Sequence, residues 1–190
     1  MALGAGLVAC TPSHAAVSFS TTPNVPDLPA LTLNGQVKTL NATMANWGVS
    51  MTSTKSGWNV TVAGDTSAGK SAVFKQYCPN ATCGTDSGPG YVTGGATLPA
   101  SSLQLNSTGA SWTGNSGTLP SHLCGSGCAM DTTAAVKIAS ATTSVSLGTW
   151  STTGYSTTSI AATIPTTVKT LTQTGEVYRV DLVWTLATGP

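Results

Sequence analysis

Short stretches in which apolar and polar residues alternate recur along this chain from Ala30 onward. A period of two is typical of strands that bury one face. Clusters of Gly, Pro, Asn or Ser close each stretch, a spacing typical of β-sandwiches and barrels. We therefore predict one all-β domain over residues 30–190, an antiparallel β-sandwich of the Ig-like or jelly-roll-like kind. The predicted strands lie at residues 31–33, 43–51, 58–62, 72–77, 101–105, 134–139, 144–150, 159–164 and 177–186.

Two neighbouring segments, 43–51 and 58–62, show clear alternation. Each places its large apolar side chains on one face, which we expect to be buried. Gly57 in the connection between them can adopt the positive φ that a tight turn needs. We therefore predict that the two segments pair as a hairpin. The predicted inward-facing residues are Ala45, Trp47, Val49, Met51, Trp58, Val60 and Val62.

The C-terminal segment 177–186 alternates most strongly of all. We predict one continuous strand with a buried face, which closes the fold. Arg179 and Asp181 share the opposite face, where we expect them to be solvated or paired. The residues of the predicted buried face are Tyr178, Val180, Leu182, Trp184 and Leu186.

The first 16 residues have features of an export signal, because residues 1–9 are mostly apolar and residues 13–16 offer small side chains for cleavage. Residues 7–10 also resemble the lipobox of bacterial lipoproteins, which makes Cys10 an alternative lipidation site. We therefore expect a secreted protein.

Residues 17–29 are predicted to be an extended lead-in to the domain. Pro23, Pro26 and Pro29 exclude both a helix and a central strand there.

Four cysteines follow the predicted signal, an even number that indicates disulfides in an exported chain. We favour two local bridges, Cys78 with Cys83 and Cys124 with Cys128, over cross-pairing, although spacing alone does not fix the connectivity. Local bridges would order two Gly-rich loops. A zinc site built from the four thiolates is the rival interpretation, but the spacings and an oxidising compartment argue against it. We therefore expect no metal.

The composition narrows the range of partners. Only 7% of the residues are charged, the net charge is +1, and 34 Thr and 22 Ser dominate the polar positions. The seven basic residues are scattered, so no electrostatic footprint for nucleic acid is present. No apolar stretch approaches the roughly 20 residues of a spanning helix, so we expect no transmembrane segment.

Catalytic groups are sparse. Six carboxylates are spread singly along the sequence, whereas acid–base catalysis usually needs two titratable groups in one cleft. Residues 64–71 superficially resemble a phosphate loop, but the first Gly is not at the required spacing and no helix is predicted after it. We therefore predict a protein that is not an enzyme and needs no cofactor.

Two tryptophan motifs give the chain a family resemblance. Trp47-Gly48-Val49 and Trp184-Thr185-Leu186 resemble the two Trp-x-Leu signatures of the WxL family of Gram-positive cell-wall-binding proteins, with Val49 in place of Leu in the first. The stretches around both motifs are also similar to that family, most closely to actinobacterial relatives, whereas the middle of the chain is unmatched. The resemblance implies non-covalent binding to peptidoglycan or another cell-wall polymer at the cell surface.

Alternation places Trp47 and Trp184 on the same faces as other apolar residues, so we expect them to be core anchors rather than ligand contacts. Glycan binding requires flat, exposed aromatic rings instead. Gly, Ser and Thr flank four aromatic residues that are candidates for stacking on a glycan, although each could also cap the core: Trp112, Trp150, Tyr91 and Tyr155.

Three functional hypotheses follow from the sequence. The first is a cell-wall-binding module. The second is a structural subunit of a surface layer or filament, whose lead-in adds to the sheet edge of another copy or of another surface protein. The third and weakest is a hydrolase of wall glycan, which would require two carboxylates brought together by the fold.

Overall fold

A computed structural model describes residues 17–52, 57–115, 117–145 and 147–189. The predicted export signal and Cys10 lie outside these residues. Within them the regular structure consists of seventeen strands without a helix. Accordingly, no helix able to cross a membrane occurs in the described part of the chain.

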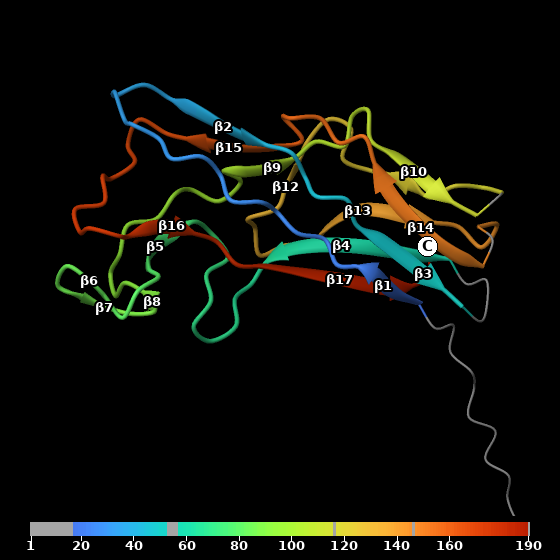
Figure 1. Cartoon of the computed structure of the whole chain (residues 1–190), viewed down its shortest axis with the longest axis horizontal. Coiled ribbons are helices and arrows are strands. Elements are labelled where there is room, and N and C mark those ends of the chain that lie inside the picture. The colour runs from blue at the N-terminus through green and yellow to red at the C-terminus, as the bar shows by residue number, and fades with distance from the viewer. Residues whose placement is uncertain (1–16, 53–56, 116, 146, 190) are drawn as a thin grey trace, which may run out of the picture.

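The protein is an antiparallel β-sandwich, as the alternating sequence predicts (Figure 1). Two four-stranded sheets form its larger end. The first has the order β1 (Val17–Thr21), β3 (Gly48–Met51), β14 (Gly148–Thr153) and β10 (Ser111–Gly114). The second has the order β11 (Ser121–His122), β13 (Val136–Ala141), β4 (Trp58–Gly64) and β17 (Leu182–Thr188).

Further sheets extend the molecule toward the left of Figure 1, and the first of them also has four strands. One has the order β12 (Cys128–Ala129), β9 (Leu103–Leu105), β15 (Ile160–Ile164) and β2 (Lys38–Ala42). Another has the order β16 (Val177–Arg179), β5 (Lys75–Cys78) and β8 (Gly90–Tyr91), next to the pair β6 (Thr82–Cys83) and β7 (Asp86–Ser87). We call β5, β6, β7, β8 and β16 together the tyrosine arm.

Four buried indoles form the centre of the larger end, and we call them the tryptophan core: Trp47, Trp58, Trp112 and Trp150. Trp112 makes edge contacts with Trp47 and Trp58, with ring centroids 4.9 Å and 5.6 Å apart. Such aromatic pairs contribute beyond the area they bury. Because Trp58 lies on β4 and Trp112 on β10, these contacts join the two sheets of the larger end.

The predicted hairpin between the first two tryptophan segments is wrong. β3 pairs with β1 and β14, whereas β4 pairs with β13 and β17 in the other sheet. The buried faces are nevertheless as predicted for both strands, except that Ala45 is exposed because β3 begins only at Gly48. Gly57 has the predicted positive φ, 68°. Alternation indicated which side chains face inward but not which strand is the neighbour.

The single C-terminal strand predicted over 177–186 is also wrong, because it is divided in two. β16 pairs with β5, and β17 pairs with β4 over seven residues. Between them the Asp181 amide donates to the Ser71 carbonyl at 2.9 Å instead of to a strand. The predicted inward face is only half-buried, since β16 and β17 each lie at the edge of their sheet.

Both local disulfides are present, Cys78–Cys83 and Cys124–Cys128, as favoured from the sequence. Such bridges are compatible with an extracellular protein. No group of three or more His, Cys, Asp or Glu that could hold a metal ion occurs in the described ranges.

The segment predicted as an extended lead-in begins with a regular strand. Residues 17–21 form β1 at the edge of the first sheet, where they pair with β3. Pro23, Pro26 and Pro29 follow in backbone that belongs to no strand.

Candidate functional site

The tryptophans predicted to stack on a glycan are core residues instead. Trp112 and Trp150 are 5% and 0% exposed, so the prediction that they offer a ring face to a ligand is wrong. The Gly, Ser and Thr residues beside them belong to β10 and β14 rather than to open loops. Alternation along these strands therefore directs both indoles inward.

The two tyrosines predicted to stack on a glycan are half-buried, and their hydroxyl groups make internal contacts. The Trp47 indole N–H donates to the Tyr155 hydroxyl at 3.0 Å. The Tyr91 hydroxyl donates to an Asp181 carboxylate oxygen at 2.5 Å, and its ring meets Tyr77 edge-on with centroids 5.1 Å apart. Both tyrosines therefore hold parts of the fold together.

The two signature motifs have different environments. Trp47 and Val49 are buried, as expected for core anchors. Trp184 and Leu186 are half-buried on β17 and pack against the outside of the core. Of the five tryptophans in the chain, Trp184 alone is not fully part of the interior. This side chain retains ring surface that a ligand can contact.

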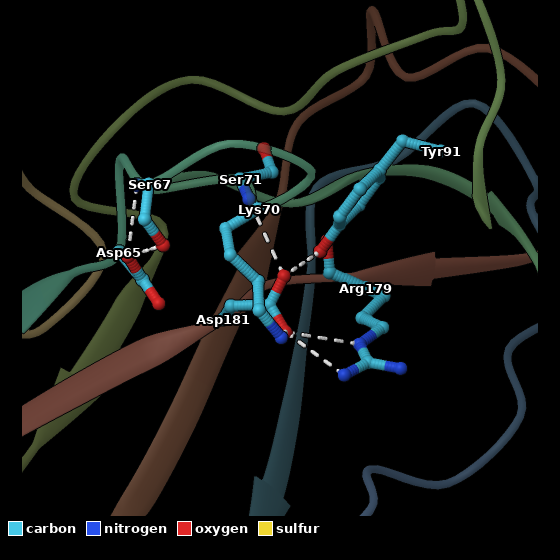
Figure 2. A network of polar contacts seen from close by, with 7 residues as sticks. All are labelled: Asp65, Ser67, Lys70, Ser71, Tyr91, Arg179 and Asp181. Carbon is cyan, nitrogen blue, oxygen red and sulfur yellow. Dashed lines mark hydrogen bonds and ion pairs between the residues drawn. The ribbon is translucent and has the colours of Figure 1, made fainter.

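The loop that follows β4 lies beside this tryptophan. Gly64 ends β4 where the chain passes Ala72 so closely that a Cβ at Gly64 would collide with the Ala72 backbone. The Asp65 carboxylate accepts hydrogen bonds from the Ser67 amide at 2.9 Å and the Ser67 hydroxyl at 2.7 Å. These contacts give the loop a defined shape and direct Lys70 toward the junction of β16 and β17 (Figure 2).

Asp181 is the centre of a polar network at that junction (Figure 2). The Arg179 guanidinium donates to one carboxylate oxygen at 2.8 Å and 3.2 Å, and the Lys70 ammonium lies 3.5 Å from the same oxygen. The other oxygen accepts the Tyr91 hydroxyl and, at 3.3 Å, the Ser71 amide. Asp181 is therefore paired, one of the two outcomes expected for it, but it is only 9% exposed.

The network fixes the charge states of its members. Burial opposes the charge on Asp181, but hydrogen bonds from Tyr91 and Arg179 outweigh it and leave the pKa of Asp181 below its ordinary value. Burial and the hydrogen bond to Asp181 together raise the pKa of Tyr91. The hydrogen bonds from Ser67 lower the pKa of Asp65. Both carboxylates are therefore ionised at neutral pH.

A small pocket of about 220 Å³ lies next to the network, and we call it the Trp184 pocket. It combines one aromatic ring, the Lys70–Asp181 ion pair, a second carboxylate, an amide and a few aliphatic groups. The set suits a ligand with an apolar face and several hydrogen-bonding groups. The lining residues are Asn24, Val25, Asp65, Lys70, Val180, Asp181, Leu182 and Trp184.

A larger groove of about 1200 Å³ adjoins the Trp184 pocket and shares Val25, Val180 and Leu182 with it. Residues of the lead-in, of the tyrosine arm and of the β2–β15 strand pair line this groove. Its lining is mostly aliphatic and proline side chains, with Tyr77 and Tyr178 from the tyrosine arm. The groove therefore offers apolar surface beside the pocket.

Two carboxylates that are far apart in the sequence come together in the tyrosine arm. A hydrogen bond with Glu176, followed by burial and by the repulsion between the two groups, raises the pKa of Asp86. Glu176 also accepts a hydrogen bond from the Gln76 side chain at 2.7 Å. The two carboxyls are in direct contact, whereas glycoside hydrolysis places its carboxyls roughly 5–10 Å apart on either side of the bond to be cleaved.

Sequence reasoning did not identify Asn24, Asp65, Lys70 and Asp181 as a group. Residues 64–71 were a partial sequence signal for the site, because they contain a cluster of Gly, Asp, Ser and Lys. That cluster is a surface loop between strands, without the helix that a phosphate loop requires. Nothing in the sequence pattern places Asn24 beside it.

Compared with models of protein families, with curated proteins and with solved structures, the chain matches none.

Proposed function

We propose that this protein is a secreted, non-catalytic protein of the cell surface that binds peptidoglycan non-covalently at the Trp184 pocket. One observation carries the proposal: of the two signature tryptophans, Trp184 keeps accessible ring surface and has Lys70, Asp65 and Asn24 as neighbours. The proposal therefore moves ligand contact from Trp112 and Trp150 to Trp184.

The chemistry of the pocket fits a wall polymer of sugar rings and acidic stem peptides. The face of an indole carries partial negative charge and attracts the C–H groups of a sugar ring. Asn24 and Asp65 offer uncharged and charged hydrogen-bonding groups for hydroxyls, and Lys70, whose side chain is 42% exposed, offers an ammonium for a stem-peptide carboxylate. A pocket of about 220 Å³ holds one such unit rather than a long chain.

The charge states support binding without hydrolysis. Glycosidases need one carboxylic acid that stays protonated near neutral pH so that it can protonate the leaving group. Both carboxyls of the Trp184 pocket, Asp65 and Asp181, have lowered pKa values and remain ionised. Asp181 is in addition committed to Arg179 and Tyr91.

The test is retention of the purified protein by sedimented peptidoglycan, with Trp184→Ala beside the wild type. We expect the substitution to reduce retention about tenfold or more, because loss of a central aromatic contact typically costs about 2 kcal/mol of binding. Val183→Ala is the matched control, since Val183 neighbours Trp184 on β17 but is 45% exposed on the opposite face. Circular dichroism confirms that both variants are folded.

Absence of wild-type retention would overturn wall binding. Equal retention of wild type and a folded Trp184→Ala would move the binding site away from this pocket. Release of sugars from the pellet during the assay would contradict the non-catalytic part of the proposal.

A structural subunit of a surface layer or filament, assembled through β-strand contacts, is the second candidate. The edge position of β1 favours it, because an N-terminal strand at a sheet edge is the element that such assemblies share between copies. Light scattering over a wide concentration range tests this function, and a strict monomer would argue against it.

A further inference from the structure

β1 is hydrogen-bonded to one neighbouring strand only. It lies at the edge of its sheet and pairs only with β3. The register shifts between Phe19 and Thr21, so the ladder is irregular after its first three residue pairs. The main apolar contact is Phe19, whose ring meets Trp47 edge-on with centroids 6.4 Å apart. β1 also contacts β17 of the other sheet, and Val17 packs against the core beside Phe19.

The chain after β1 has a separate attachment. Thr22 is exposed, whereas Pro23 is buried and Val25 and Leu28 pack against the core. The exposed Thr22 therefore connects two separately attached pieces, β1 and residues 23–29. Proline limits the directions in which such a short connection can turn. Short, constrained hinges of this kind favour exchange of a terminal element between copies.

The surface that β1 covers is shaped for a strand. A Cβ on Gly48 would lie 2.5 Å from the Ser20 hydroxyl and 2.7 Å from the Trp150 carbonyl oxygen, so β3 fits closely between β1 and β14. Without β1 the outer edge of β3 would expose the backbone groups that β1 now pairs. A second copy of the chain carries the one segment already known to fit this edge.

We propose that β1 exchanges between copies, so that residues 17–21 of one molecule pair with β3 of another. The contacts of β1 are the same in both arrangements, so the balance depends on the backbone conformation at Thr22 and on protein concentration. Reciprocal exchange gives a closed dimer, and head-to-tail exchange gives a chain of molecules. The exchange goes beyond peptidoglycan binding and does not require it.

Cysteine cross-linking tests the exchange in the full chain. Ser18 and Ser50 are directly opposite in the β1–β3 ladder, so cysteines at these positions are close enough to form a disulfide. Ser18→Cys and Ser50→Cys are introduced into separate copies, both with Cys10→Ser, because the other four cysteines are already paired. The copies are mixed at high concentration under mild oxidation. We expect a covalent heterodimer as the main new product.

Two controls make the result decisive. Ser18→Cys mixed with Thr113→Cys, an exposed position on the opposite edge strand β10, measures random collisions and should give several-fold less heterodimer. Ser18→Cys and Ser50→Cys in the same chain should lock β1 in place and keep the protein monomeric at every concentration. Equal heterodimer from both mixtures would overturn the exchange. Retention of the locked chain on peptidoglycan is measured separately, so wall binding and exchange can fail independently.

Discussion

The tryptophan core and the tyrosine arm hold their strands together by different means. In the core, four indoles have at most 5% exposure, and edge contacts among three of them join two sheets. In the tyrosine arm the strands are short and bury little apolar surface. They are stabilised instead by a disulfide, by a cation over an aromatic ring and by hydrogen bonds. The Arg179 guanidinium lies 4.7 Å from the centre of the Tyr77 ring, for example.

The Trp184 pocket lies at the border between these regions. The chain leaves the arm after β16 and joins the core at Leu182, where β17 begins, so Asp181 between the two strands has polar partners and Trp184 is half-buried. Burial of apolar area stabilises the core, whereas polar contacts stabilise the border. These polar contacts can be removed without creating a cavity in the core. In this chain with few charges, the ionised groups of the Asp181 network lie where the apolar packing ends.

The largest effect is expected in the core. Trp47→Ala should lower the free energy of unfolding by about 4 kcal/mol, because it removes a fully buried indole and its contact with Trp112. Trp184→Ala should cost less than half as much, because its indole is only half-buried. Urea denaturation of both variants measures the difference. Equal losses would mean that the two signature tryptophans are equivalent, contrary to their environments.

The two disulfides provide the second contrast. Cys78→Ser with Cys83→Ser should cost about 2 kcal/mol or less, because a bridge with a sequence separation of 5 closes only a short loop. We expect faster amide hydrogen exchange in residues 75–91 and little change in the tryptophan core, since this bridge is not part of the main hydrophobic cluster.

Cys124→Ser with Cys128→Ser is the matched comparison. This bridge has a similar separation, 4, but Cys124 belongs to the main cluster. Its loss should therefore increase exchange in core strands such as β9 and β13. The same local pattern from both substitutions would contradict the separation of arm and core.

Much of the fold could be predicted from alternation. Trp58, Val60 and Val62 are buried as the period of two indicates. The neighbours of β4 could not be predicted, because alternation describes one strand at a time and pairing depends on segments up to about 130 residues away. The break at Asp181 was missed for the same reason, since it depends on the Ser71 carbonyl.

The site was less predictable than the fold. Flanking Gly, Ser and Thr suggested that Trp112 and Trp150 lie in loops, but in a chain with 34 Thr and 22 Ser these residues also fill strands. The strongly alternating C-terminal segment suggested that Trp184 is buried. Alternation reports which side of a strand faces inward but not how deep the packing on that side is.

The smallest effect concerns the polar border. Asp181→Asn should lower the free energy of unfolding by about 1.5 kcal/mol at neutral pH, because it removes a charge that Arg179 and Tyr91 stabilise. The pKa of Asp181 is below its ordinary value of 3.8 in the folded protein, so the folded state favours the ionised form. This contribution is present above that value and is lost as pH falls through the lowered folded-state pKa.

The wild type and Asp181→Asn should therefore converge in stability between about pH 5 and about pH 2, as measured by denaturation at each pH. Asp27→Asn, an exposed carboxylate of the lead-in, is the matched control and should follow the wild type across this range. A constant difference between wild type and Asp181→Asn at every pH would show that the variant acts through packing rather than charge.

Asp181→Asn should also affect ligand binding. The Lys70 ammonium is paired with the Asp181 carboxylate, so the substitution should free this ammonium for a ligand carboxylate. Peptidoglycan retention should then be maintained or increased, although the fold itself is weaker.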